Sequence, residues 1–125
     1  MRLLLDTHIY HWSFYERGRL SQLACKLIDD AEEIFVSSAS LWEIAIKVRL
    51  GKMKADPQEL LDNLEESGFQ ELPVFAKHAI LVAKLPLHHA DPFDRLLIAQ
   101  AMSEPLHLLT VDAQLQKYSE LVIQV

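Results

Sequence analysis

Five carboxylates of this 125-residue chain stand at predicted strand ends or near helix starts: Asp6, Glu43, Asp91, Asp94 and Asp112. In an open α/β sheet, loops at the carboxyl ends of the strands converge, and ligands bind there. Two like charges about 4 Å apart repel by roughly 4 kcal/mol at an effective dielectric of about 20, so converging acids need a cation. Oxygen ligands of this kind suit Mg²⁺ or Mn²⁺. The expected chemistry is metal-assisted hydrolysis of a phosphodiester.

Most of these acids also have a structural interpretation as part of a helix start. Asp91 precedes Pro92, which predicts an N-cap followed by proline at the first helical position. Asp94 would then be the third helical residue, where the acid of a capping box reaches back to free backbone amides. Asp6 and Asp112 fit as N-caps equally well. The position of these acids along the chain therefore leaves both interpretations open.

Glu43 has two structural alternatives of its own. The segment "SLWE" matches a capping box with Ser40 as the cap and Glu43 as the acid. Glu43 also stands four residues before Lys47, a spacing that predicts an ion pair on one helix face. Whether Glu43 meets the other acids depends on the sheet that the rest of the sequence builds.

Hydrophobic periodicity and turn residues predict strands that alternate with helices. The expected strands are residues 2–6, 34–37, 69–72, 106–111 and 121–125. The expected helices are residues 7–16, 20–33, 40–52, 56–68, 74–85, 92–104 and 112–118. This alternation favours an α/β layer structure with a mostly parallel sheet. At this length we expect residues 1–125 to form one domain with a single sizeable core.

The composition narrows the class of protein. Half of the residues are apolar and only 3 are glycine, which is typical of a compact domain. The one cysteine, Cys25, excludes an intramolecular disulfide framework and agrees with a cytoplasmic location. We expect neither a signal peptide nor a membrane segment, since no apolar run approaches the roughly 20 residues that span a bilayer. The two tryptophans, Trp12 and Trp42, fit core or interface packing better than base stacking.

The net charge of −6 argues, taken alone, against a nucleic-acid partner. The distribution of charge says more, because residues 47–54 carry Lys47, Arg49, Lys52 and Lys54 without an acid among them. This cluster is either a solvated helix end, where cations interact with the helix dipole, or a phosphate-binding patch beside an active site.

The histidines offer a competing site. His8 and His11 are three residues apart on a predicted helix, and His88 and His89 are adjacent. A zinc or iron site built on them would lack an accompanying ligand signature such as HExxH. Surface or capping histidines are the preferred interpretation.

Four blocks of the sequence, taken in order, resemble the PIN-domain ribonucleases, specifically the VapC-like toxins of type II toxin–antitoxin pairs. The blocks are "LLLDTHIYHW", "SSASLWEIAIKVRLGKM", "HHADPFDRLLIAQA" and "LLTVD". The resemblance implies a three-layer α/β/α fold around a parallel sheet of four or five strands. It also implies Mg²⁺- or Mn²⁺-dependent cleavage of RNA and control by a small VapB-like antitoxin. The high apolar content suits a homodimer or another partner surface.

Carried over by position, the family acids are Asp6 in "LLLDTH", Glu43 in "SLWEI", Asp94 in "DRLLIA" and Asp112 in "TVD". Asp91, one turn before Asp94, either assists it or takes its place. On this reading Asp6 and Asp94 hold the metal directly. Glu43 completes the metal shell or orients the attacking water, and Asp112 binds metal through water or a second ion.

Lys47 and Arg95 are the expected contacts to the scissile or a neighbouring phosphate, with ion pairing and surface solvation as the equal alternative. Two other classes of protein are compatible with parts of the pattern. A receiver-like signalling domain shares the size and an acidic Mg²⁺ pocket, but it needs an acid pair after the first strand and a lysine after the last. A catalytically silent PIN domain would only bind RNA or a partner protein.

Overall fold

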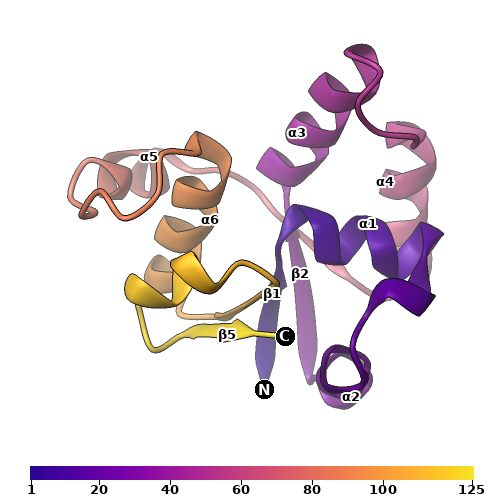
Figure 1. Cartoon of the computed structure of the whole chain (residues 1–125), viewed down its shortest axis with the longest axis horizontal. Coiled ribbons are helices and arrows are strands. Elements are labelled where there is room, and N and C mark those ends of the chain that lie inside the picture. The colour runs from indigo at the N-terminus through magenta and orange to yellow at the C-terminus, as the bar shows by residue number, and fades with distance from the viewer.

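All five strands of the sheet run parallel, in the order β3-β2-β1-β4-β5. The computed structural model describes residues 1–125, and its strands are β1 (Arg2–Leu5), β2 (Glu33–Ser37), β3 (Gln70–Leu72), β4 (His107–Thr110) and β5 (Val122–Gln124). From β1 the chain builds outward to β2 and β3, then returns to the other side of β1 for β4 and β5 (Figure 1). This reversal makes a switch point between β1 and β4, the place where open parallel sheets bind ligands.

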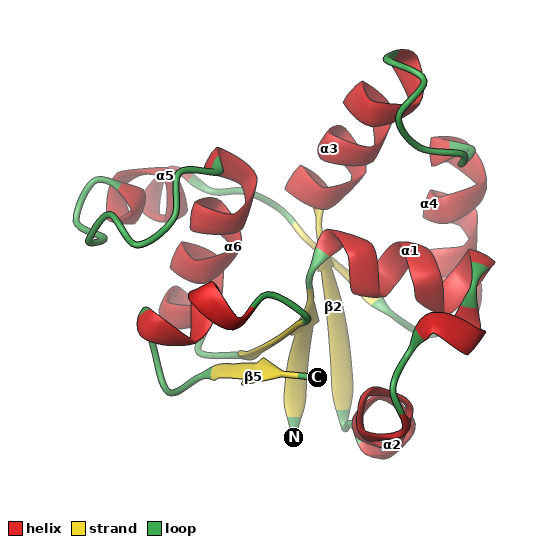
Figure 2. Ribbon diagram, in the orientation of Figure 1, coloured by secondary structure: helices red, strands yellow, loops and turns green.

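Six α-helices and two short 3₁₀ helices connect the strands (Figure 2). They are α1 (Thr7–Tyr15), η1 (Arg17–Arg19), α2 (Gln22–Asp30), α3 (Ser38–Arg49), α4 (Pro57–Glu66), α5 (Ala76–Val82), α6 (Pro92–Ser103) and η2 (Ala113–Lys117). None of the helices combines the length and apolar character needed to cross a membrane.

Side chains alternate between the two faces of the sheet, and each face has its own apolar cluster. On one face Leu3 and Leu5 of β1 pack with residues of α1, α2 and α4. On the other face Leu4 packs with residues of α6, including Leu97 and Ile98. The sheet is therefore covered on both sides, which confirms the three-layer α/β/α prediction, but the core consists of two clusters rather than one.

The strand register brings the carboxyl ends of the central strands level with one another. Leu5 of β1 pairs with Val36 of β2 and with Leu109 of β4. Asp6, which follows Leu5, and Thr110, which follows Leu109, therefore lie side by side at the carboxyl edge of the sheet. The acids predicted at strand ends gather at this edge.

The predicted elements are all present, with shifted ends. The helix expected at residues 74–85 extends only over Ala76–Val82, and the one expected at 20–33 only over Gln22–Asp30, because Glu33 already belongs to β2. Positive φ angles of 72° at Gly51 and 76° at Gly68 confirm the predicted stops of α3 and α4. The strand order also rules out a receiver domain, whose sheet runs 2-1-3-4-5.

Candidate active site

Asp6 lies at the switch point, directly after β1, and its side chain is only 5 % exposed. Its Oδ1 accepts from the amide of Ile9 at 2.8 Å, which confirms Asp6 as the N-cap of α1. Its Oδ2 accepts from the Thr110 hydroxyl at 2.5 Å. That hydroxyl in turn accepts from the backbone amide of Asp112 at 3.1 Å, so Thr110 links the acids at the ends of β1 and β4.

Glu43 comes from α3 and is as buried as Asp6. The Thr7 hydroxyl donates to its Oε1 at 2.7 Å, and Lys47 forms an ion pair with its Oε2 at 2.8 Å. Thr7 is the first residue of α1, so this contact places Glu43 beside the helix that Asp6 caps. The predicted Glu43–Lys47 ion pair is present, and it places the Lys47 ammonium group beside Glu43 near the carboxyl edge of the sheet.

The prediction that Ser40 caps this helix is wrong. The helix begins three residues earlier, where the Ser37 hydroxyl accepts from the amide of Ala39 at 3.0 Å. Ser40 is buried instead, with its hydroxyl 3.0 Å from that of Thr7. Glu43 therefore lies nearly two turns into the helix, where it has no capping role.

At the start of α6, Asp91 and Asp94 have different roles. Asp91 is the N-cap, as predicted, because its Oδ1 accepts from the amides of Phe93 at 2.8 Å and Asp94 at 3.1 Å. The backbone amide of Asp91, which the acid of a capping box would satisfy, donates to Nδ1 of His89 at 3.0 Å. The capping-box interpretation of Asp94 is therefore wrong, and its carboxylate is free of helix capping.

Asp112 caps η2 through Oδ1, which accepts from the amide of Gln114 at 2.9 Å. Its Oδ2 lies 3.0 Å from Nε2 of His89, and the same nitrogen lies 3.6 Å from Oδ2 of Asp94. Since Nδ1 of His89 accepts from an amide, Nε2 carries the hydrogen and donates to Asp112. The ligand atoms of His89, Asp94 and Asp112 all lie within 4.8 Å of one another.

The carboxylates of the site lie close enough to raise the pKa of Asp94. Burial and the charges of Asp91, Asp6 and Glu43 raise the pKa of Asp94 to about 7, against a small opposing effect of His89. Burial also raises the pKa of Asp6, although the hydrogen bond from Thr110 opposes it. Such a set of oxygen donors, short of positive charge, fits a divalent cation. One histidine, His89, stands beside the carboxylates in the group whose ligand atoms lie closest together.

Arg95 does not reach toward the acids. Its guanidinium donates to the carbonyl oxygens of Pro86 at 3.0 Å and Val82 at 3.1 Å, and to the Tyr118 hydroxyl at 3.2 Å. The same hydroxyl accepts from the amide of His89 at 2.8 Å. Arg95 and Tyr118 thus hold the segment before α6, and with it His89, in place. The predicted contact of Arg95 with phosphate has no support in this geometry, since its terminal nitrogens are already engaged.

The sequence interpretation missed two residues of the site, Thr7 and Thr110, and preferred a surface or capping role for His89. Thr7 and Thr110 position Glu43 and Asp6, and His89 stands between Asp94 and Asp112. The threonines follow or end predicted strands, which could have pointed to them. The sequence also offers His89 as a metal ligand, but its place beside Asp112 could not be predicted, because the two residues are 23 positions apart in the chain.

Replacing Asp91 with alanine removes the cap of α6 but leaves Asp94 in place. We expect this variant to lose about 0.5–2 kcal/mol of unfolding free energy. We also expect it to retain more activity than Asp94→Asn. Urea denaturation and an RNA cleavage assay check both parts. A less active Asp91 variant would mean that the residue before Pro92 is the principal ligand.

The raised pKa of Asp94 makes stability and metal binding depend on pH in opposite directions. In the folded state the pKa of Asp94 is about 7, whereas in the unfolded state the carboxyl releases its proton near the ordinary pKa of 3.8. Asp94 therefore favours folding at low pH, and this contribution is lost as pH rises toward 7. Metal binding requires the ionised form, so we expect the gain in melting temperature with Mn²⁺ to be larger at about pH 8 than at about pH 5. Equal gains at both pH values, measured by thermal denaturation, would contradict Asp94 as a ligand.

The sequence model of the PIN domain family matches residues 3–121. The chain belongs to the PIN domain family. Its five-stranded parallel sheet flanked by helices is thus the sheet of a PIN domain. The chain is 30 % identical over 122 residues to Ribonuclease VapC22 of Mycobacterium tuberculosis, a match that covers 93 % of this chain and 91 % of the relative.

Solved structures share this PIN fold. VapBC2 from Rickettsia felis, bound to a DNA fragment from its promoter, aligns with a TM-score of 0.73 and 21 % identity, over 100 % of this chain and 98 % of that one. VapC20 of Mycobacterium tuberculosis, a toxin that cleaves the sarcin-ricin loop, aligns with a TM-score of 0.66 and 13 % identity, over 98 % of this chain and 99 % of that one. The agreement over the whole length confirms the predicted fold.

Proposed function

We propose that this PIN domain is a metal-dependent endoribonuclease and the toxin of a toxin–antitoxin pair. The observation that carries the proposal is the gathering of Asp6, Glu43, Asp94 and Asp112 around the switch point of the sheet. The 30 % identity to a relative named as a ribonuclease supports the same activity. RNA is accordingly the proposed substrate, and the cytoplasm the proposed location.

The acids divide into ligands and supporting groups. Asp6 and Asp94 are the proposed direct ligands of Mg²⁺ or Mn²⁺, and Asp112 contributes through water or a second ion. When bound, the cation supplies charge stabilisation at the phosphate and lowers the pKa of a water molecule. Asp91 holds the start of α6, so that the ligand set keeps its geometry.

Glu43 and Lys47 act next to the metal ligands. Thr7 and Lys47 hold the two oxygens of Glu43, which fixes the carboxylate for orienting a water molecule toward phosphorus. Lys47 is partly exposed, so its ammonium group can contact a phosphate oxygen while it stays near Glu43. Hydrolysis would break the bond from phosphorus to the leaving ribose oxygen, which takes up a proton.

A small antitoxin is the proposed protein partner. Solved structures with this fold include DNA-bound VapBC from Salmonella typhimurium and FitAcB from Neisseria gonorrhoeae. On α3 and at its C-cap, the side chains of Trp42, Ile46 and Leu50 are exposed about one turn apart, an apolar stripe that suits a protein partner or a second copy of the chain. A basic side chain of the antitoxin would neutralise the acid cluster.

Incubation of purified, partner-free protein with total RNA tests the activity. We expect endonucleolytic fragments with Mg²⁺ or Mn²⁺ and none with EDTA. Expression of the chain alone should slow growth, and co-expression of the small protein encoded beside it should restore growth. If the protein neither cleaves RNA nor slows growth, the domain is catalytically silent and the proposal fails.

A further inference from the structure

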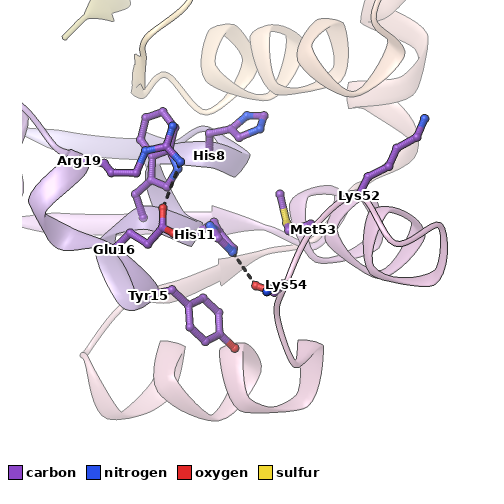
Figure 3. Close-up of a pocket in the computed structure, with 9 residues that line it drawn as sticks. His8, His11, Tyr15, Glu16, Arg19, Lys52, Met53 and Lys54 are labelled. Carbon is purple, nitrogen blue, oxygen red and sulfur yellow. Dashed lines mark hydrogen bonds and ion pairs between the residues drawn. The ribbon is translucent and has the colours of Figure 1, made fainter.

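A cavity of about 550 Å³ opens along α1, separate from the catalytic acids. Its main lining residues are His8, His11, Trp12, Tyr15, Arg19 and Lys52 (Figure 3). None of these residues has a part in the acid cluster described above. The volume is within the range of pockets that hold small organic ligands.

The wall that α1 contributes consists entirely of rings. His8, His11, Trp12 and Tyr15 follow the spacing i, i+3, i+4 and i+7, which places them on one face of the helix. His8 lies 5.7 Å from Trp12, and His11 lies 5.0 Å from Tyr15, measured between ring centroids. The expectation that Trp12 belongs to the core or an interface is therefore incomplete, because Trp12 also lines an open cavity.

The opposite wall is the segment after α3, and two rings of α1 fasten it. Nε2 of His11 lies 3.0 Å from the carbonyl oxygen of Lys54 (Figure 3), and since a carbonyl only accepts, that nitrogen carries the hydrogen. The Tyr15 hydroxyl accepts from the amide of Asp56 at 3.0 Å. Nδ1 of His11 is buried and has no partner. The cavity is thus held open by specific contacts between α1 and residues 54–56.

Arg19 forms a planar platform at the cavity. Its guanidinium carbon lies 4.5 Å from the centroid of the Trp12 ring, and its Nη1 pairs with Oε2 of Glu16 at 3.1 Å. The side chain is still 61 % exposed. A guanidinium held in this way leaves one flat face to solvent, and unpaired RNA bases stack on such planes and on aromatic rings.

Two features connect the cavity to the acid edge. His8 is two residues from Asp6, in the first turn of the helix that Asp6 caps, so the cavity wall begins directly beside that carboxylate. Lys52 follows α3, where its amide donates to the carbonyl oxygen of Lys47 at 2.8 Å. Lys52 forms no ion pair, so its ammonium group is available to a phosphate.

We propose that this cavity binds one unpaired nucleotide of the RNA, next to the phosphate that is cut, with its base against Arg19 and Trp12 and a phosphate at Lys52. The inference rests on the proposed function and adds to it the subsite that holds the flanking base. A peptide tail is the weaker candidate, because only three of the nine lining residues are hydrophobic. Flat rings, a stacked guanidinium and a free lysine match the chemistry of a nucleotide better.

Binding can be measured without cleavage in the Asp94→Asn background with Mg²⁺ present. The probes are single-stranded decaadenylate and a decamer of the same ribose-phosphate backbone without bases. We expect decaadenylate to bind about tenfold more tightly, a difference of about 1.4 kcal/mol. Adding Arg19→Gln or Trp12→Leu should reduce this difference to less than about twofold, since stacking is the source of the difference. Lys52→Gln should weaken both probes alike.

Arg17→Gln is the matched control, because Arg17 lies on the same 3₁₀ helix but pairs with Asp29 outside this cavity. It should leave the preference for bases unchanged. Equal binding of the two probes, or an equal loss with Arg17→Gln and Arg19→Gln, would overturn the subsite. Protection of Trp12 from solvent by the antitoxin but not by RNA would also overturn the subsite, because the cavity would then bind the protein partner. If cleavage of total RNA by the wild type fails while the base preference holds, the ribonuclease proposal fails and the nucleotide site stands.

Discussion

The Asp94→Asn variant is expected to lose RNA cleavage by at least about 100-fold while it gains stability at neutral pH. The loss follows because a metal ligand contributes several kcal/mol to stabilising the transition state, and each 1.4 kcal/mol is about tenfold in rate. The gain follows because burial and three neighbouring acids raise the pKa of Asp94 to about 7, so its charge opposes folding above that pH. We expect about 1–3 kcal/mol more unfolding free energy without metal.

Asp30→Asn, on the exposed end of α2, is the matched control and should leave cleavage unchanged. Cleavage rates and urea denaturation at about pH 8 measure both properties, where Asp94 is ionised in the wild type. An Asp94→Asn protein that still cleaves at the wild-type rate would exclude Asp94 from the metal site. One that is inactive but less stable would mean that the carboxylate is needed for the fold.

Mn²⁺ should stabilise the wild-type protein strongly and the Asp6→Asn variant hardly at all. A ligand present at about 100 times its Kd adds about 2.7 kcal/mol to the free energy of unfolding. Asparagine can still cap α1 through its side-chain oxygen, so the hydrogen bond from the amide of Ile9 is kept. It removes a charge that burial and Glu43 disfavour, so the metal-free variant should melt at a higher temperature than the wild type.

Thermal denaturation with and without millimolar Mn²⁺ measures both the melting temperature of the metal-free protein and its increase on binding Mn²⁺. Ca²⁺ at the same concentration reports how far the site discriminates by size. If Asp6→Asn melts lower than the wild type and responds fully to Mn²⁺, the buried carboxylate at the switch point is not a ligand.

The sequence predicted what depends on local chemistry. The Asp91–Pro92 start of α6 and the Gly51 and Gly68 stops of α3 and α4 are all found, because caps and positive φ angles are properties of a few neighbouring residues. The alternation of strands and helices predicted a parallel sheet, and the apolar run before Asp6 predicted that this residue lies at a strand end.

What the sequence could not predict depends on residues far apart in the chain. The local pattern around Ser40 fits a helix cap, yet Ser37 has that role and the Ser40 hydroxyl lies against that of Thr7, 33 residues away. For Arg95 the sequence left phosphate contact and surface solvation as equal alternatives, and the loop carbonyls that bind its guanidinium come together only in the folded chain. The sequence also could not decide whether Asp91 or Asp94 is the carboxylate that is free of helix capping. The answer depends on His89, whose ring satisfies the amide that Asp94 would otherwise cap.

A crystal of the wild-type protein grown with Mn²⁺, examined by anomalous scattering at the manganese edge, tests the central claim most directly. The claim is that the acids at the carboxyl edge form one metal centre. We expect an anomalous peak within about 2.0–2.3 Å of carboxylate oxygens of Asp6 and Asp94, with Glu43 and Asp112 beside it. A peak held by other residues, or none at saturating Mn²⁺, would contradict the account.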